Sequence, residues 1–302
     1  MKPAALQPGD TIGVMAPSSY VEREDIERAK AIVEAKGFKV FVHPQTFERE
    51  NQSAGTTLQK SLAFQGLWQR DDIKAIWCAG GGNRAMHVLD SINFKAIEKK
   101  PKILIGFSDN TVLLNGLYAH TKMPSIHGPV FKNLDKYNEW DDLLALLSGK
   151  TPTYTLDTAV QVKQGHAEGV LVGGNLSLFQ YLPQTLPGDF YKDAILFLED
   201  VNEEPSKLDR MFHHLKRTGV LKNIAGLILG DFGDLKETGR PFGYSLLDII
   251  IEYTDELSIP IVMNAPFGHG KQLLPLPVGV KSRLIVENTT EISIREPVAL
   301  TV

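Results

Sequence analysis

The first half of the chain alternates short apolar runs with amphipathic stretches. Apolar runs of strand length occur at 11–16, 38–42, 75–78 and 103–107. Between them the apolar residues recur at helical spacing, which predicts helices over 26–35, 58–68, 84–89 and 110–120. The run at 103–107 is nearly continuous, as expected for a strand whose two faces are both covered. This rhythm predicts an α/β fold built on a doubly wound parallel sheet.

The alternation resumes in the second half after an interruption. A helix is expected at 139–147, and the next stretch is rich in Thr, Pro and Gln, which favours a connection between domains. Further strands and helices are predicted at 194–198, 206–218, 224–229, 246–257 and 259–263. The pattern therefore predicts an N-terminal α/β domain over 1–149, a linker over 150–167 and a C-terminal α/β domain over 168–302.

Composition narrows the class of protein. Of the 302 residues, 43% are apolar and 23% are charged, which is typical of a globular protein with a substantial core. The net charge of −4 argues against a nucleic-acid partner. No apolar run reaches the length of a membrane helix or a signal peptide, and Cys78, the only cysteine, can form no intrachain disulfide. These features predict a cytoplasmic protein that does not associate with membranes.

The strand 103–107 ends on Gly106-Phe107-Ser108, and a helix is expected at once. A tight turn from strand to helix is the geometry of a nucleophile elbow, which exposes a serine hydroxyl above the sheet. Amide groups at the start of the helix would face a developing oxyanion there. The alternative is that Ser108 only caps the helix. Asn110 stands where the usual Gly-x-Ser-x-Gly pattern has its last glycine.

A serine nucleophile needs a base, and the base needs an acid that orients it. His269, in a glycine-flanked loop after the strand 259–263, is the first candidate for the base, and His127 is the second. Either could instead be a loop histidine bonded to backbone. The adjacent His213 and His214 lie in a predicted helix and point to different faces, so they do not form a metal site.

The acid is expected where the apolar strand 194–198 ends. Glu199 follows that strand directly, at the edge of the sheet where ligands bind. Asp200, the next residue along the strand, should face the opposite way. Glu203 and Glu204 compete for the role, but they precede Pro205 and more naturally belong to the start of a helix.

A glycine-rich turn follows the strand 75–78. The pattern Gly80-x-Gly82-x-x-Ala85 fits a loose dinucleotide-binding fingerprint, but it occupies the third strand–helix unit rather than the first. The same glycines would equally bring backbone N–H groups against an oxyanion. Cys78 precedes this turn and is expected to be a buried core residue rather than a thiol nucleophile.

Taken together, these segments resemble the LD-carboxypeptidases of peptidase family S66. The resemblance runs in the same order from about 11 to 279 and is carried by Gly-Phe-Ser108-Asp-Asn-Thr, His127-Gly-Pro, Gly-Gly-Asn175-Leu-Ser, Leu-Glu199-Asp-Val-Asn-Glu-Glu-Pro, Asp-Arg210, Phe-Gly-His269-Gly and Leu-Pro-Leu-Pro-Val-Gly279.

The resemblance implies a catalytic triad and its surroundings. Ser108 would be the nucleophile, Glu199 the acid and His269 the base, without a metal or an organic cofactor. Backbone N–H groups of Asp109 and of the turn 80–82, with Gly81 at its centre, would bind the oxyanion. Two more residues, Asn175 and Arg210, would hold substrate. The family implies a two-domain cytoplasmic homodimer.

The resemblance also implies a substrate. Members of the family remove the terminal D-alanine from murein tetrapeptides, and a second branch cleaves microcin-type peptidyl or aminoacyl nucleotides. The murein branch usually carries Arg-Gly-Gly-Tyr-Gly at the glycine turn, whereas Ala79-Gly80-Gly81-Gly82-Asn83 stands here and is closer to the second branch. The expected activity is hydrolysis of a muropeptide. Immunity-type hydrolysis and a non-catalytic small-ligand binder are the alternatives, and a dinucleotide oxidoreductase ranks last.

Overall fold

The computed structural model describes residues 2–301, which divide into two compact units. Among these residues the first unit comprises those up to Pro152, Leu274–Val280 and those from Glu296 onward, and the second comprises Thr153–Leu273 and Lys281–Arg295. Both are α/β domains, which confirms the predicted fold class. No helix within residues 2–301 is long and apolar enough to cross a bilayer.

The first unit contains a mostly parallel six-stranded sheet in the order β12-β5-β4-β3-β1-β2. Its strands are β1 (Thr11–Met15), β2 (Lys39–Val42), β3 (Ile73–Cys78), β4 (Ile103–Gly106), β5 (Ser125–His127) and β12 (Leu276–Val278). The strands β2, β1, β3, β4 and β5 are parallel neighbours, and β12 pairs antiparallel with β5. This 2-1-3-4-5 order is that of a doubly wound sheet, in which ligands bind at the carboxyl ends of the strands.

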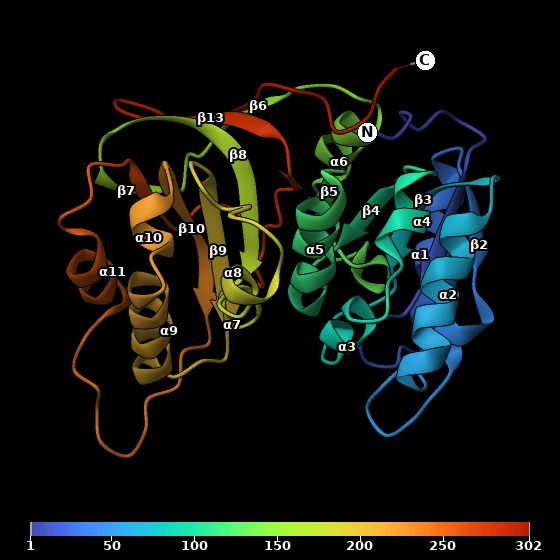
Figure 1. Cartoon of the computed structure of the whole chain (residues 1–302), viewed down its shortest axis with the longest axis horizontal. Coiled ribbons are helices and arrows are strands. Elements are labelled where there is room, and N and C mark those ends of the chain that lie inside the picture. The colour runs from blue at the N-terminus through green and yellow to red at the C-terminus, as the bar shows by residue number, and fades with distance from the viewer. Residues whose placement is uncertain (1, 302) are drawn as a thin grey trace. The chain divides into compact units, whose positions relative to one another are not determined.

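Helices cover both faces of this sheet. Figure 1 shows α2 and α5 in front of the sheet and α1 behind it. The helical segments are α1 (Arg23–Ala35), η1 (Pro44–Phe47), α2 (Thr57–Gln69), α3 (Ala85–Leu89), α4 (Phe94–Glu98), η2 (Ser108–Asn110), α5 (Thr111–Thr121), η3 (Phe131–Asn133) and α6 (Trp140–Leu147). The predicted strands and helices of this half are confirmed to within a few residues at each end.

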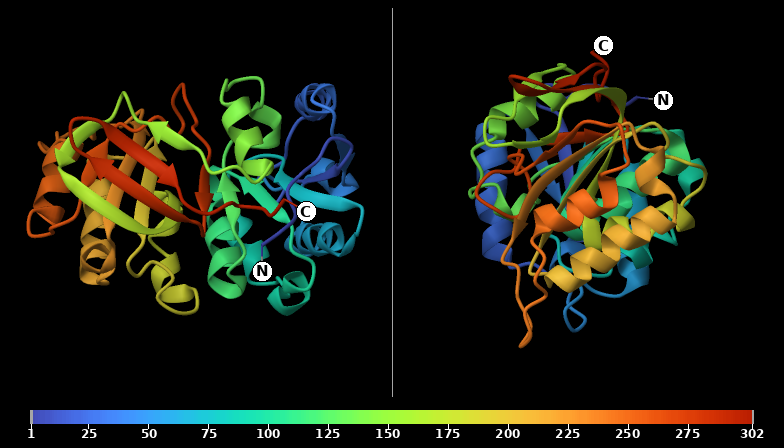
Figure 2. Two further views of the ribbon diagram at one scale, coloured as in Figure 1. Left: turned by 90° about the horizontal axis from the view of Figure 1, so that it is seen from above. Right: turned by 90° about the vertical axis from the view of Figure 1, so that its left-hand side faces the viewer.

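The second unit is built on a mixed eight-stranded sheet in the order β6-β14-β13-β8-β9-β10-β11-β7. Its strands are β6 (Thr153–Thr155), β7 (Val160–Lys163), β8 (Gly165–Asn175), β9 (Ile195–Val201), β10 (Gly226–Gly233), β11 (Ile261–Met263), β13 (Lys281–Val286) and β14 (Thr290–Ile294). The long strand β8 pairs antiparallel with β13 through its first half and parallel with β9 through its second. The view from above in Figure 2 shows how β8 connects the two parts of the sheet.

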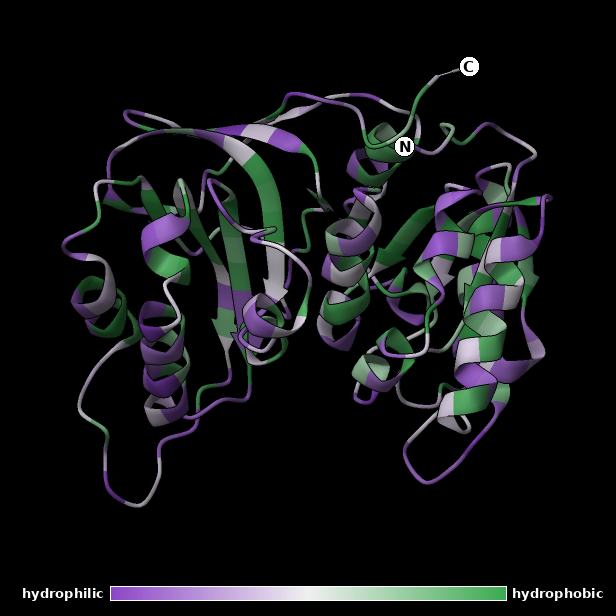
Figure 3. Cartoon of the chain, viewed as in Figure 1, coloured by the Kyte–Doolittle hydropathy of each residue, from purple (hydrophilic) through white to green (hydrophobic). Residues whose placement is uncertain are grey.

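Helices of the second unit lie against the parallel strands. They are α7 (Leu176–Phe179), α8 (Leu182–Thr185), α9 (Pro205–Arg217), α10 (Val220–Asn223) and α11 (Leu246–Thr254). The helix α9 begins on Pro205, whose fixed φ suits the first helical turn, and buries Leu208, Phe212 and Leu215 on one face. In Figure 3 the central strands are predominantly apolar, whereas α9 is mostly hydrophilic along its outer side.

The structure divides the chain differently from the expected domain boundaries. The predicted linker 150–167 contributes β6 and β7 to the second sheet, where β6 pairs antiparallel with β14 and β7 pairs antiparallel with β11. The segment Leu274–Val280 lies in the first unit rather than the C-terminal domain, since β12 pairs with β5 there. Segments this short carry too little hydrophobic periodicity to be recognised from sequence.

Candidate active site

Ser108 lies at a sharp strand-to-helix turn. It follows β4 and extended Phe107 and has φ of +62°, the left-handed region that a non-glycine residue adopts at a cost of about 1–3 kcal/mol. Gly106 makes the turn possible, because a Cβ there would lie 2.8 Å from the Cβ of Asn110. The turn has the conformation expected of a nucleophile elbow, and its strain is concentrated on the one residue whose hydroxyl the chemistry requires.

Asn110 joins the elbow to the glycine turn. Its Nδ2 donates to the carbonyl of Phe107 at 2.8 Å and to the carbonyl of Gly80 at 3.0 Å. The side chain is fully buried, so these two hydrogen bonds fix the turn beside the serine. In the sequence Asn110 stands out only as a departure from the usual glycine, and no local signal indicates this connecting role.

Gly81 packs directly on the candidate nucleophile. A Cβ on Gly81 would lie 3.1 Å from the Cβ and 3.3 Å from the Oγ of Ser108. The N–H of Gly81 meets no acceptor among residues 2–301, so it remains available to a ligand. An N–H group in this position is what a backbone oxyanion donor requires.

The side chain of Asp109 faces inward. It is 3% exposed, its Oδ2 accepts a hydrogen bond from the N–H of Ala85 at 2.8 Å, and burial raises the pKa of this carboxyl. The carboxylate of Asp109 therefore fixes α3 and the end of the glycine turn against the elbow. The predicted oxyanion donor at this residue is its backbone N–H, not its side chain. Cys78 is buried, and burial raises its thiol pKa, which confirms it as a core residue.

The second unit brings together the predicted acid and base. His269 Nδ1 and Glu199 Oε2 are 2.7 Å apart, although 70 positions separate the two residues. Glu199 is fully buried near the end of β9, and His269 keeps a quarter of its side chain exposed. The ring is therefore held by a carboxylate that has no access to water, and its other nitrogen is not engaged by this pair.

Electrostatics at this pair favour the protonated imidazole. Burial lowers the pKa of His269, but the hydrogen bond and charge of Glu199 and the charges of Asp200 and Asp231 outweigh it, so the pKa is raised. Burial raises the pKa of Glu199, and the hydrogen bond and charge of His269 oppose that shift. A carboxylate that stabilises an imidazolium in this way is suited to a proton-accepting histidine.

Asp200, the residue after Glu199 on β9, hydrogen-bonds to Asn175 and Ser177. Its Oδ1 accepts from Nδ2 of Asn175 at 3.0 Å, and its Oδ2 accepts from the N–H and Oγ of Ser177 at 2.9 and 2.8 Å. Asn175 ends β8 in register with Glu199. The structure thus places the candidate substrate ligand Asn175 beside the acid, with an orientation set by Asp200.

The remaining candidates are Arg210 and His127. Arg210 is exposed on α9 and makes no hydrogen bond or ion pair among residues 2–301, so its predicted role in binding substrate remains a prediction. His127 is fully buried in β5 and packs edge-on against Phe107, which makes it a poor base. No group of three or more His, Cys, Asp or Glu side chains in the described part of the chain could hold a metal ion.

Both units match known domains in sequence. Residues 12–128 match the LD-carboxypeptidase N-terminal domain, and residues 168–284 match the LD-carboxypeptidase C-terminal domain. The chain belongs to the LD-carboxypeptidase family, peptidase family S66. The family assignment from sequence is confirmed. The glycine turn lies within the matched N-terminal domain, so the family match does not support the dinucleotide interpretation.

Relatives in this family carry two kinds of name. A probable murein peptide carboxypeptidase of Bacillus subtilis is 32% identical, over 96% of this chain and 92% of its own. The microcin C7 self-immunity protein MccF of Escherichia coli is 28% identical, over 97% and 95%. MccF in complex with aspartyl sulfamoyl adenosine superposes with a TM-score of 0.89 at 25% identity, over 99% of this chain and 100% of the other. A muramoyltetrapeptide carboxypeptidase from Oxalobacter formigenes superposes with a TM-score of 0.85 at 27% identity, over 94% and 98%.

Proposed function

We propose that this protein is a serine-type LD-carboxypeptidase that removes a terminal D-amino acid, such as D-alanine, from murein tetrapeptides. The observation that carries the proposal is the 2.7 Å pair of His269 and Glu199, in a chain whose other family domain presents Ser108 on a strained elbow. Each family domain supplies one part of a serine triad, in the order Ser, Glu, His.

The proposed reaction is acyl transfer to water. His269 accepts the hydroxyl proton of Ser108, whose oxygen attacks the carbonyl carbon before the terminal D-residue. We expect about 3 Å between Ser108 Oγ and a ring nitrogen of His269 in the reacting complex. The imidazolium then gives its proton to the departing amine. Water, deprotonated by the same imidazole, releases the acyl group from Ser108.

Other residues bind the substrate and its developing charge. The backbone N–H groups of Gly81 and Asp109 would stabilise the tetrahedral oxyanion. Support for Gly81 comes from its contact with Ser108 and its unengaged N–H. Asn175 and Arg210 would contact the peptide. Asn175 is the better supported of the two, because its amide is already oriented beside Glu199.

A direct assay distinguishes the two branches of the family. The purified protein is incubated with a murein tetrapeptide and, separately, with a hydrolysable aminoacyl-nucleotide analogue, and the products are weighed by mass spectrometry. The proposal expects loss of one alanine from the tetrapeptide. Cleavage of the nucleotide substrate alone would assign the protein to the immunity branch. Absence of both reactions would favour a small-ligand binder.

The immunity branch remains the second candidate because of the glycine turn. Asn83 stands in the turn after Gly80-Gly81-Gly82, an arrangement closer to that branch than to the murein branch. The Nδ2 of Asn83 donates to Oε1 of Gln52 at 3.1 Å, and both residues line a pocket of about 460 Å³ in the first unit. A substrate with a second polar moiety would find hydrogen-bonding groups here.

We predict that kcat/KM rises with pH through one ionisation. The base acts when His269 is neutral, so activity is lost as pH falls below its pKa. Because that pKa is raised, the midpoint should lie above about 6.5, the value of an unperturbed histidine. The midpoint is measured from a pH–rate profile recorded at substrate concentrations well below KM. A flat profile between about pH 5 and 8 would show that His269 is not the base.

We predict that activity survives treatment with a strong chelator, since every step of the proposed reaction is carried by protein groups. Rates measured before and after dialysis against EDTA should agree. A rate that falls on chelation and returns with added zinc would contradict the serine mechanism.

A further inference from the structure

A third carboxylate lies beside the acid–base pair. Asp231 is near the end of β10, where pairing with β9 slips by one residue between Leu229 and Phe232. As a result two residues, Gly230 and Asp231, stand opposite the single residue Glu199. A bulge of this kind redirects side chains and often lies next to a functional site. Here it lies opposite the proposed catalytic acid.

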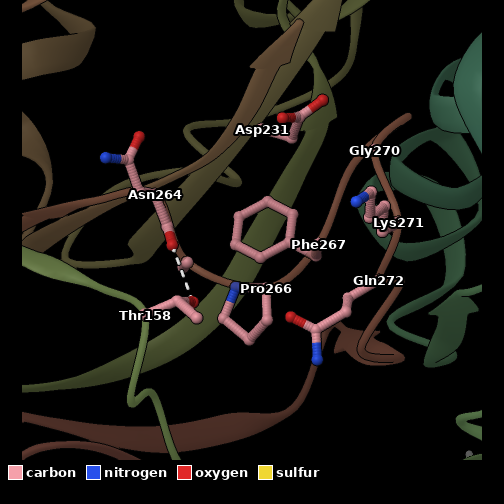
Figure 4. Close-up of a pocket in the computed structure, with 9 residues that line it drawn as sticks. Thr158, Asp231, Asn264, Pro266, Phe267, Gly270, Lys271 and Gln272 are labelled. Atoms are coloured by element: carbon pink, nitrogen blue, oxygen red, sulfur yellow. Dashed lines mark hydrogen bonds between the residues drawn. The ribbon is translucent and has the colours of Figure 1, made fainter.

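Beyond its pairing with β11, β10 binds the loop that carries His269. The N–H of Ala265 donates to the carbonyl of Leu229 at 3.0 Å, and the N–H of Asp231 donates to the carbonyl of Phe267 at 2.7 Å. Figure 4 shows this loop passing Phe267 and reaching Gly270 close to Asp231. The bulge is therefore in direct contact with the segment that sets the position of the imidazole.

Three glycines form a cradle around the Asp231 side chain. A Cβ on Gly268, whose φ is +131°, would lie 2.8 Å from the Asp231 Cβ. A Cβ on Gly270 would lie 3.0 Å from its Cγ, and one on Gly233 would lie 2.9 Å from its Oδ2. Gly268 and Gly270, on the two sides of His269, thus have no side chain where they lie against Asp231. The Asp231 carboxylate occupies the space that those side chains would take.

Packing rather than hydrogen bonding holds this carboxylate. It makes no hydrogen bond or ion pair with any residue in the range 2–301, and it lines a pocket of about 220 Å³. Burial raises the pKa of Asp231, and the charge of His269 opposes the shift. The charged groups that act on His269 are Glu199 and Asp200 from β9 and Asp231 from β10.

We propose that Asp231 is a positioning residue for His269, which holds the loop through the glycine cradle and adds a further negative charge that acts on the imidazolium. The inference rests on the proposed function only in taking His269 as the base. The triad acid Glu199 orients the ring through a hydrogen bond, whereas Asp231 acts through the loop backbone and at longer range. The two contributions are separable by substitution.

The charge is tested with Asp231→Asn, which keeps the size of the side chain. Asp234→Asn removes a carboxylate from the same segment without touching the cradle and serves as the control.

The His269 ring is titrated by NMR in the free protein, with its signal assigned by loss in His269→Asn. We expect Asp231→Asn to lower the pKa of His269 and to move the acid limb of kcat/KM to lower pH. The plateau value of kcat, reached at a pH where His269 is fully deprotonated, should stay within about threefold of the parent value. The loss of a remote charge has little effect on the rate once the base is neutral. Equal shifts in Asp231→Asn and Asp234→Asn, or none in either, would overturn the electrostatic part.

The cradle is tested by a steric pair. Gly270→Ala places a methyl group 3.0 Å from the Asp231 Cγ, so it should displace the loop and lower kcat by about tenfold to a hundredfold. The double variant Asp231→Ala, Gly270→Ala removes that clash and should recover at least part of the loss. A double variant no better than Gly270→Ala would refute the positioning role. The NMR titration needs no substrate, so these outcomes are distinguishable from failure of the proposed activity.

Discussion

Replacing Ser108 with alanine should abolish turnover, with kcat lowered by about 10⁴-fold to 10⁶-fold. Without the hydroxyl no acyl-enzyme can form, and the remaining rate comes only from substrate binding and oxyanion stabilisation. Single-turnover assays with the tetrapeptide measure the loss. Substrate binding, followed by calorimetry, should be nearly unchanged, because the substitution removes one oxygen atom. Retention of more than a tenth of the parent rate would show that Ser108 is not the nucleophile.

The same position gives a stability prediction that follows from its backbone. Alanine at φ of +62° keeps the left-handed strain, whereas glycine does not. Ser108→Gly should therefore be at least as stable as Ser108→Ala, although at a helical position glycine costs about 0.5–1 kcal/mol relative to alanine. Denaturant unfolding of the two inactive variants compares them directly. A Ser108→Gly variant less stable than Ser108→Ala would show that the elbow is not strained.

Glu199→Gln should lower kcat by about 10⁴-fold while the protein stays folded. An amide of the same shape no longer stabilises the imidazolium and favours the wrong tautomer of His269. The fold should tolerate it, because Glu199 is fully buried and burial disfavours its charged form. Steady-state kinetics above the pKa of His269 and a thermal melt provide the two measurements.

Asp200→Asn is the matched control on the same strand. Its carboxylate accepts hydrogen bonds from Asn175, Ser177 and the N–H of Val201, and an amide has only one oxygen with which to accept them. We expect it to destabilise the protein by about 1–3 kcal/mol and to lower kcat far less than Glu199→Gln. If Asp200→Asn were inactive and Glu199→Gln active, or if Glu203→Gln alone abolished turnover, the assignment of Glu199 as the acid would fail.

Much of the site could be predicted because its residues stand at recognisable boundaries. Ser108 follows a continuous apolar strand, and Glu199 follows another, so the ends of these strands pointed to both. The same rule, applied to the predicted strand 224–229, would have drawn attention to Asp231, which lies just beyond its end. It was missed because Gly230 intervenes and the bulge that redirects the chain leaves no periodic signal.

Sequence by itself determined many of the helices and strands, the family and the types of residue at the strand ends, since hydrophobic periodicity and glycine positions are local properties of a chain. Only the tertiary structure decided which of these residues meet. It joined His269 to Glu199 across 70 positions, packed Gly81 on Ser108 and returned 274–280 to the first sheet. Such contacts depend on the register of the strands, on the β-bulges and on the positions where only glycine leaves enough room. These are set by the packing of segments far apart in the chain, and no local pattern encodes them.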